Sequence, residues 1–228
     1  MSFPVPAAKL WLFDIDGTLV DTGGAGMKSL QEASLQIFGH EGPSLDLAGS
    51  TDLGIAALIH AHFEIEPTAE RIENYFNAYL ACLDRNLAEG GFPGQVFDGV
   101  VEVLNELSNR PGATLGLLTG NISAGASSKM RHFGLAAYFP FGAYGCDHAD
   151  RNLLGPIALE RAALHASRSF TPEETWVIGD TPKDIACAHA IGARCLAVAT
   201  GRFSPAELSA AGADAVVSSM KEALRHLG

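Results

Sequence analysis

The chain has 228 residues, of which 47% are hydrophobic and 18% are charged, and its formal net charge is −11 at pH 7. This length fits one large domain, or one domain that carries a smaller one, and the composition is that of a globular protein with a full core. The negative charge argues against binding to nucleic acid or to anionic membranes, because both need basic patches.

Signals for export and membrane insertion are missing from the sequence. We find no uninterrupted apolar run of about 18 residues, and the first residues lack the basic and apolar regions of a signal peptide. Four widely spaced cysteines, with no C-x-x-C pair, indicate reduced thiols rather than disulfides or a metal site. We therefore expect a soluble, cytoplasmic protein without a membrane partner, present as a monomer or a homodimer.

The first predicted element is a short buried strand over residues 10–13, which are all apolar. It runs directly into Asp14-Ile15-Asp16-Gly17-Thr18. Side chains alternate along a strand, so Asp14 and Asp16 would share a face, and Gly17 favours a turn just after them. In open α/β sheets this carboxyl edge is where ligands bind. Because two crowded acids repel each other unless a cation lies between them, the stretch predicts a metal site.

Helices are expected throughout the next segment. After a glycine-rich stretch at residues 21–26, apolar spacing predicts helices over 27–38 and 53–63, and a third from near Pro67 to about residue 87. We expect no strand between residues 21 and 88. The sequence Glu89-Gly90-Gly91-Phe92-Pro93-Gly94 then ends the helical pattern.

Strands and helices alternate over the remainder of the chain. We expect strands at 113–118, 139–145, 175–178, 194–198 and 215–217, and helices at 96–107, 122–133, 156–166, 182–191, 205–210 and 221–227. Strands separated by single helices predict right-handed βαβ units and a parallel sheet. The predicted fold class is α/β, with a Rossmann-like three-layer core around a central parallel sheet and an inserted all-helical cap domain. The core would comprise residues 1–19 and 91–228, and the cap residues 20–90.

Two further polar sites follow predicted strands. Thr119-Gly120-Asn121 offers a hydroxyl and then backbone N–H groups at the start of a helix, which together can bind an anion. In Gly179-Asp180-Thr181-Pro182-Lys183-Asp184, Asp180 ends a strand and Asp184 lies on the first turn of the next helix. Acids stabilise a helix N-terminus, which accounts for Asp184 but not for Asp180. Hard oxygen ligands without a histidine or cysteine cluster favour Mg²⁺ over zinc.

The order of these sites resembles the motifs of the haloacid-dehalogenase-like (HAD) hydrolase superfamily, in particular the phosphoglycolate-phosphatase-like branch with a helical cap. The resemblance covers almost the whole chain. It implies that Asp14 is a nucleophile that becomes phosphorylated and that Asp16 is the general acid/base. It also implies Mg²⁺ ligands at Asp14, Asp16 (through its backbone carbonyl) and Asp180, with Asp184 as an inner- or outer-shell partner. The phosphate-binding residues that it implies are Gly17, Thr119, Gly120 and Asn121.

The positive residue of the superfamily's third motif departs from the usual pattern. No lysine lies between residues 133 and 180, but Arg151 is close to the expected position and can bond oxyanions in a bidentate manner. We predict a catalytic role for Arg151, with Lys129 and Lys183 as alternatives. The pair Thr51-Asp52 resembles a loop by which the cap reaches over the substrate, and an ordinary helix N-cap is an equally good interpretation.

The resemblance implies a Mg²⁺-dependent phosphatase that hydrolyses a small phosphorylated metabolite through an aspartyl-phosphate. The nearest alternative is a phosphomutase similar to β-phosphoglucomutase, which has the same core. A dehalogenase is disfavoured because Asp16 supplies an acid/base that displacement at a C–halogen bond does not need. A signalling module phosphorylated on aspartate is disfavoured because such domains are shorter and have no helical insert.

Overall fold

The computed structural model describes residues 9–89 and 91–227. Its centre is a six-stranded parallel sheet with the strand order β5-β4-β1-β6-β7-β8. The strands are β1 (Leu10–Phe13), β4 (Thr114–Leu118), β5 (Gly142–Ala143), β6 (Thr175–Gly179), β7 (Arg194–Val198) and β8 (Ala215–Val217). The parallel sheet predicted from the sequence is therefore confirmed.

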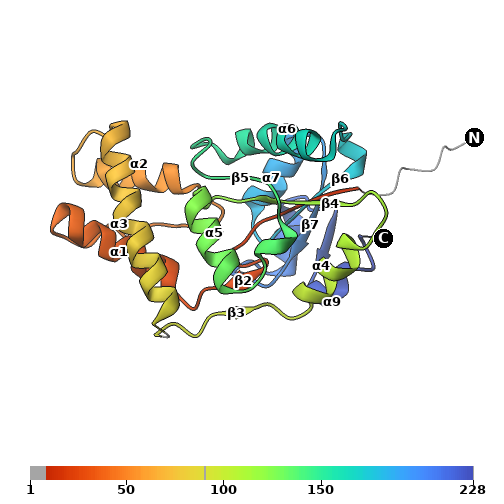
Figure 1. Cartoon of the computed structure of the whole chain (residues 1–228), viewed down its shortest axis with the longest axis horizontal. Coiled ribbons are helices and arrows are strands. Elements are labelled where there is room, and N and C mark those ends of the chain that lie inside the picture. The colour runs from red at the N-terminus through yellow and green to blue at the C-terminus, as the bar shows by residue number, and fades with distance from the viewer. Residues whose placement is uncertain (1–8, 90, 228) are drawn as a thin grey trace, which may run out of the picture.

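Helices cover both faces of this sheet, with α6 and α7 on one side and α4 and α9 on the other (Figure 1). These helices are α4 (Val100–Ser108), α5 (Ser123–His132), α6 (Leu154–Ala166), α7 (Pro182–Ala190), α8 (Pro205–Ala210) and α9 (Met220–Ala223). Strand β1 explains why both faces are covered, since its alternate side chains enter different clusters. Trp11 and Phe13 pack on the α4 side, whereas Leu10 and Leu12 pack on the α6 side. The result is the three-layer α/β core that the sequence predicts.

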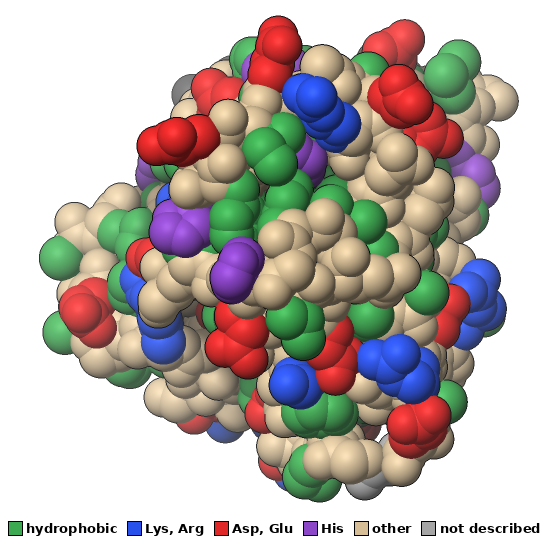
Figure 2. Space-filling view, turned by 90° about the vertical axis from the view of Figure 1, so that its left-hand side faces the viewer, with side chains coloured by type: hydrophobic (Ala, Val, Ile, Leu, Met, Phe, Trp, Pro, Cys, Tyr) green, Lys and Arg blue, Asp and Glu red, His purple; other side chains and the backbone are tan. Residues whose placement is uncertain are grey.

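Three helices, α1 (Ala25–Phe38), α2 (Asp52–His62) and α3 (Ala69–Ala88), lie together at one end of the molecule, on the left of Figure 1. They enclose an apolar cluster of their own, which includes Leu30, Ile59, Tyr75 and Leu83, and Ile122 at the start of α5 joins it. On the face seen in Figure 2, hydrophobic side chains gather near the centre, and acidic and basic side chains are interspersed around them. That residues 20–90 form a separate cap domain stays a prediction.

The connections to these helices differ from the sequence prediction. We expected no strand between residues 21 and 88 and a helix from residue 96, yet β2 (Val20–Asp21) pairs antiparallel with β3 (Gln95–Val96), and the helix begins only at Val100. Both expectations were wrong, because the pairing depends on two distant segments lying side by side. Gly94 permits this approach, since a Cβ there would come within 2.7 Å of the Asp21 carbonyl oxygen.

Most other elements lie within a few residues of their predicted limits. The strand expected at 139–145 is reduced to β5, and the helix expected from residue 156 starts at Leu154, preceded by a 3₁₀ turn at Arg151–Leu153. Within the described residues, no helix combines the length and the apolar character that crossing a membrane requires.

Candidate active site

The carboxyl end of β1 carries the first acidic residues of the site. Asp14 is only 6% exposed, and its backbone N–H donates to the Ile178 carbonyl of the neighbouring β6 (2.9 Å). The chain then turns at Gly17, as predicted, with a φ of +81° that favours glycine. A Cβ at Gly17 would also overlap the carboxylate of Asp180. Glycine is therefore required here both by the backbone conformation and by the approach of the second acid.

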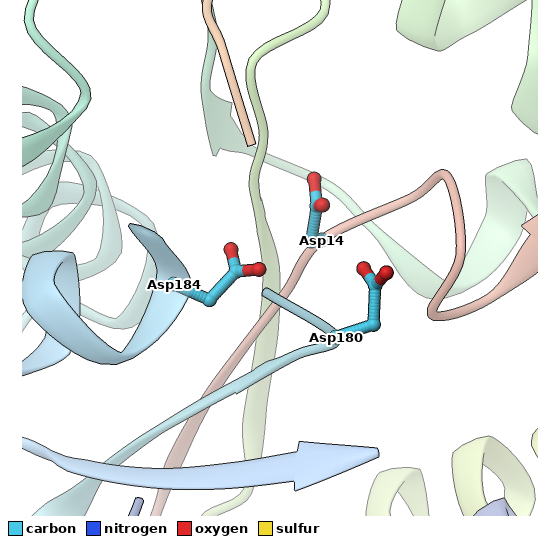
Figure 3. A group of neighbouring side chains, drawn as sticks. All are labelled: Asp14, Asp180 and Asp184. Atoms are coloured by element: carbon cyan, nitrogen blue, oxygen red, sulfur yellow. The ribbon is translucent and has the colours of Figure 1, made fainter. Parts of the chain in front are cut away.

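Three carboxylates converge at this edge of the sheet (Figure 3). Asp14 comes from β1, Asp180 follows β6, and Asp184 lies in the first turn of α7, and one oxygen of each lies within 4.8 Å of the others. Burial raises the pKa of Asp14 to about 6, with the Arg151 guanidinium opposing the shift. Burial and the charge of Asp184 raise the pKa of Asp180 to about 8. Burial thus disfavours the charged form of both carboxylates, and a bound cation would stabilise it, so the oxygen cluster fits a cation.

Asp184 is already hydrogen-bonded through both oxygens. Its Oδ1 accepts from Nη2 of Arg151 (2.5 Å), and its Oδ2 accepts from the backbone N–H (3.0 Å) and the hydroxyl (2.7 Å) of Thr181. The Thr181 hydroxyl in turn accepts from the Asp184 N–H, which completes a capping box at the start of α7. Asp184 thus holds Arg151 and Thr181 in place, and both of its carboxylate oxygens are already engaged in hydrogen bonds.

Arg151 is the basic residue nearest to the cluster. It lies in the 3₁₀ turn before α6, where the Asp150 side chain caps the turn. Its Nη2 is 3.2 Å from Asp14 Oδ1 and 2.5 Å from Asp184 Oδ1, and it donates to the Leu118 carbonyl. The structure therefore brings Arg151 to the position between two acids where a positive partner was expected. Lys183, one of the alternatives, instead donates to the Ser50 hydroxyl at the surface (2.7 Å).

Lys129, the other alternative, also reaches the site but contacts a different acid. It projects from α5, is 3% exposed, and donates to both oxygens of Asp16 (2.6 and 2.8 Å) and to Oδ1 of Asn121 (2.6 Å). From the sequence we proposed Lys129 only as a substitute for Arg151. Its contact with Asp16 could have been anticipated, because Lys129 lies on the apolar face of α5. That face is formed by Ile122, Ala126, Met130 and Phe133. A lysine on a buried helix face needs an anionic partner.

A polar network joins the second predicted site to Asp16. The Asn121 amide donates to Oδ2 of Asp16 (2.8 Å) and to the buried hydroxyl of Thr119 (2.9 Å). The Thr119 hydroxyl also accepts from the Asn121 backbone N–H. Hydrogen bonding to Thr119 acts to lower the pKa of Asp14, so this hydroxyl lies beside the predicted nucleophile.

The loop containing Thr51-Asp52 contacts the core at the same place. Thr51 is the N-cap of α2, accepting from the Gly54 N–H (3.1 Å), and its hydroxyl donates to the Ala149 carbonyl (2.7 Å). The Asp52 N–H donates to the Gly120 carbonyl (2.7 Å), and Oδ2 of Asp52 accepts from the Ile122 N–H (2.8 Å). The helix N-cap interpretation is confirmed for Thr51, whereas a role of this pair over the substrate stays a prediction.

These residues surround a cavity of about 320 Å³ between the sheet edge and the three helices. The end formed by the sheet edge carries Asp14, Asp16, Asp180, Lys129 and Arg151. The segment of α1, α2 and α3 lines the rest with five large apolar or aromatic side chains, Met27, Leu30, Leu47, Ile55 and Tyr79, and with the polar Asp21, Thr22, Ser50 and Asp52. A cavity of this size admits a small molecule, with charged groups fixing one end.

Comparison with known proteins adds to this geometry. Residues 11–198 match the family described as haloacid dehalogenase-like hydrolase. The phosphoglycolate phosphatase of Thiobacillus denitrificans is 28% identical over 226 residues, which cover 97% of this chain and 96% of the relative. A solved structure from Clostridium acetobutylicum, titled a predicted phosphatase, has a TM-score of 0.73 at 23% identity and covers 97% of this chain and 99% of its own. CbbY from Rhodobacter sphaeroides in complex with phosphate also has a TM-score of 0.73, at 21% identity, with 95% and 96% coverage.

Proposed function

Since this chain belongs to the haloacid dehalogenase-like hydrolase family, we propose that it is a phosphatase that hydrolyses a small phosphomonoester through an aspartyl-phosphate on Asp14. One observation carries this proposal. Asp14 lines a small cavity with a guanidinium 3.2 Å from one of its oxygens and two further carboxylates beside it. A carboxylate held next to a cation and opposite an empty volume can approach a phosphate dianion.

The cation that we propose for the acidic cluster is Mg²⁺, because the donors are all hard oxygens. The Asp14 and Asp180 carboxylates and the backbone carbonyl of Asp16 would hold it. Asp184 would not contact the ion directly, since its oxygens accept hydrogen bonds from Arg151 and Thr181. When bound, the ion would screen the negative charges and polarise the phosphoryl oxygens as a Lewis acid.

The chain's own residues divide the reaction between them. A carboxylate oxygen of Asp14 forms a bond to phosphorus while the bond from phosphorus to the leaving oxygen breaks. Asp16 gives that oxygen its proton, so the alcohol leaves neutral. Asp16 then takes a proton from the water that attacks the aspartyl-phosphate, which releases inorganic phosphate and restores both acids. Arg151, the Thr119 hydroxyl and the Gly120 N–H would bind the non-reacting phosphoryl oxygens.

Residues 20–90 would act as a cap over this reaction. Two features support the domain limits of 1–19 and 91–228 for the core and 20–90 for the cap. The three helices have a separate apolar cluster, and the β2–β3 ribbon forms their two connections. The bonds from Thr51 and Asp52 to the core would hold the cap closed, and substrate entry would require that these bonds break.

A phosphomutase is the second candidate, because its chemistry would use the same phosphorylated Asp14 and could take place in the same cavity. The two functions differ in their products. A phosphatase releases inorganic phosphate in proportion to the substrate consumed, whereas a mutase converts the substrate to an isomeric phosphomonoester and releases no inorganic phosphate.

The experiment for the proposed function measures phosphate release from a panel of phosphomonoesters, with Mg²⁺ and with EDTA. We expect activity only with the metal, and a loss of about 10³-fold or more in kcat for Asp14→Asn, whose amide cannot act as the nucleophile. Undiminished turnover in EDTA, or full activity of Asp14→Asn, would refute the mechanism.

A further inference from the structure

The wall of the active-site cavity that faces the acids determines what can be attached to the phosphate. Its large apolar and aromatic side chains are Met27, Leu30, Leu47, Ile55 and Tyr79, and the segment of α1, α2 and α3 also lines the cavity with Asp21, Thr22, Ser50 and Asp52. Apart from the Tyr79 hydroxyl, the five large side chains present only carbon and sulfur. They therefore offer apolar contact to the leaving group.

The charges around the cavity are strongly unbalanced. Two basic residues line it, and both are already paired, Lys129 with Asp16 and Arg151 with Asp14 and Asp184. All 15 lysines and arginines of the chain lie in the described ranges 9–89 and 91–227, and within these ranges no third basic residue lines the cavity. Five aspartates line it: Asp14, Asp16, Asp21, Asp52 and Asp180. A leaving group with its own negative charge would find no free cation here.

Asp52, at the start of α2, adds to the disadvantage of a negatively charged leaving group. It is buried, and one of its oxygens accepts the Ile122 N–H, so the carboxylate is held in place at the cavity. An anionic group bound nearby would be repelled by its negative charge.

Tyr79 supplies the polar contact that a neutral leaving group could use. The residue is 2% exposed and lines the cavity, and we find no hydrogen bond from its hydroxyl to any of the described residues. The hydroxyl atom itself is accessible from the cavity, so a hydroxyl group on the bound substrate can form a hydrogen bond to it in place of water.

On the basis of the proposed phosphatase function, we infer that the substrate is the monophosphate of an uncharged alcohol with a short apolar portion and a second hydroxyl group that pairs with Tyr79. Phosphomonoesters that carry a carboxylate on the leaving group are poor substrates. Met27, Asp52 and Tyr79 are the residues that set this preference.

The test compares substrates that differ only in the end group. Hydroxyethyl phosphate and 2-phosphoglycolate share a two-carbon length, as glycerol 3-phosphate and 3-phosphoglycerate share a three-carbon length. We expect kcat/KM to favour the hydroxyl member of each pair by tenfold or more. If neither pair is turned over by an enzyme that hydrolyses p-nitrophenyl phosphate, their inhibition constants against that reaction give the same comparison.

The outcomes separate the inference from the function on which it rests. Equal values, or a preference for the carboxylate member, would overturn the inference and leave the phosphatase function intact. Absence of phosphate release from every phosphomonoester, p-nitrophenyl phosphate included, would refute the proposed function itself.

Two variants test the residues named. Met27 is 41% exposed in the first turn of α1, so an arginine can reach the cavity from there without being buried. Met27→Arg should shift the substrate ratio at least tenfold towards the carboxylate, whereas its neutral control Met27→Gln should affect both members of a pair alike. Tyr79→Phe should remove the preference for hydroxyethyl phosphate over propyl phosphate. An unchanged ratio in Met27→Arg, or a preserved hydroxyl preference in Tyr79→Phe, contradicts the assignment.

Discussion

Replacing Lys129 with methionine would remove the only basic side chain that contacts Asp16 among the described residues. Lys129 donates to both oxygens of Asp16 and to Oδ1 of Asn121, all at 2.6–2.8 Å. The side chain of Asp16 is already 43% exposed, so without Lys129 only the Asn121 amide would hold the carboxylate, which could then rotate towards solvent. Methionine keeps a similar volume, and the buried Asn121 oxygen loses its donor, which costs about 1–3 kcal/mol of stability.

The effect on catalysis should depend on the step. General acid/base catalysis contributes about 10²–10⁴-fold, and a misplaced group loses about 10²-fold. We therefore expect steady-state kcat to fall roughly 100-fold, or about 2.7 kcal/mol. With p-nitrophenyl phosphate the first step needs no proton, because the nitrophenolate is a good leaving group. Lys129→Met should then release a rapid burst of nitrophenol, followed by slow turnover as hydrolysis of the aspartyl-phosphate becomes limiting.

Stopped-flow absorbance at a substrate excess measures both phases. The matched control is Lys28→Met, since Lys28 is a surface lysine 3.9 Å from Glu32. It should behave as wild type. If the burst in Lys129→Met slows as much as the steady state, with KM raised, then Lys129 binds the phosphoryl group rather than positioning Asp16. Unchanged steady-state turnover would contradict any role.

Three further substitutions test the surroundings of the acids. Arg151→Met leaves buried carboxylates without a compensating charge, so thermal unfolding should show a stability loss of about 3–5 kcal/mol that Mg²⁺ partly restores. A stability loss that Mg²⁺ leaves unaltered would contradict the proposed metal site. Gly17→Ala places a Cβ at a φ of +81°, where it would overlap the Asp180 carboxylate. Calorimetric titration should therefore show weaker Mg²⁺ binding, and the free energy of unfolding should fall by about 1–3 kcal/mol. An unaltered Mg²⁺ affinity would refute this prediction. Burial raises the pKa of Asp52 to about 6 from 3.8, so the stabilisation present below pH 3.8 is lost as pH rises through 6. Asp52→Asn lacks this titration, and its unfolding free energy relative to wild type should increase between about pH 4 and 7, by at most about 3 kcal/mol. Urea denaturation at several pH values measures the difference, and a constant difference would show that Asp52 does not titrate in this way.

The sequence predicts the parts of the fold that depend on local pattern. Strand β1 could be placed because both of its faces are apolar, and α7 because Thr181-Pro182 marks its start. The convergence of Asp14, Asp180 and Asp184 also follows, since parallel strands end at one edge, Asp14 and Asp180 each follow a strand, and Asp184 lies in the first turn of the helix after Asp180. None of this needs the tertiary structure in advance.

Contacts between distant segments are what the sequence leaves undetermined. The pairing of Val20 with Val96 joins two residues that no local pattern distinguishes from a loop and a helix start. The approach of Ser50 to Gly120 is of the same kind. Only glycine fits at that position, because a Cβ would overlap the Ser50 carbonyl oxygen, yet Thr119-Gly120-Asn121 is also ordinary turn chemistry. A glycine in the sequence shows that a close approach of another segment is possible, but it does not show which segment approaches.

The basic residues of the site are a second feature that the sequence alone does not determine. The sequence suggests one basic residue and offers Arg151, Lys129 and Lys183 for it. The structure instead assigns two, with Arg151 between Asp14 and Asp184 and Lys129 on Asp16. The two basic side chains contact different acids, so the first motif places Asp14 beside a guanidinium and Asp16 beside an ammonium group. Under the proposed mechanism, these separate partners would let Asp14 act as the nucleophile and Asp16 as the proton carrier. Because Asn121 and Thr119 connect Lys129 to the surroundings of Asp14, the effects of Arg151→Met and Lys129→Met on KM and on the post-burst rate should be non-additive in the double variant.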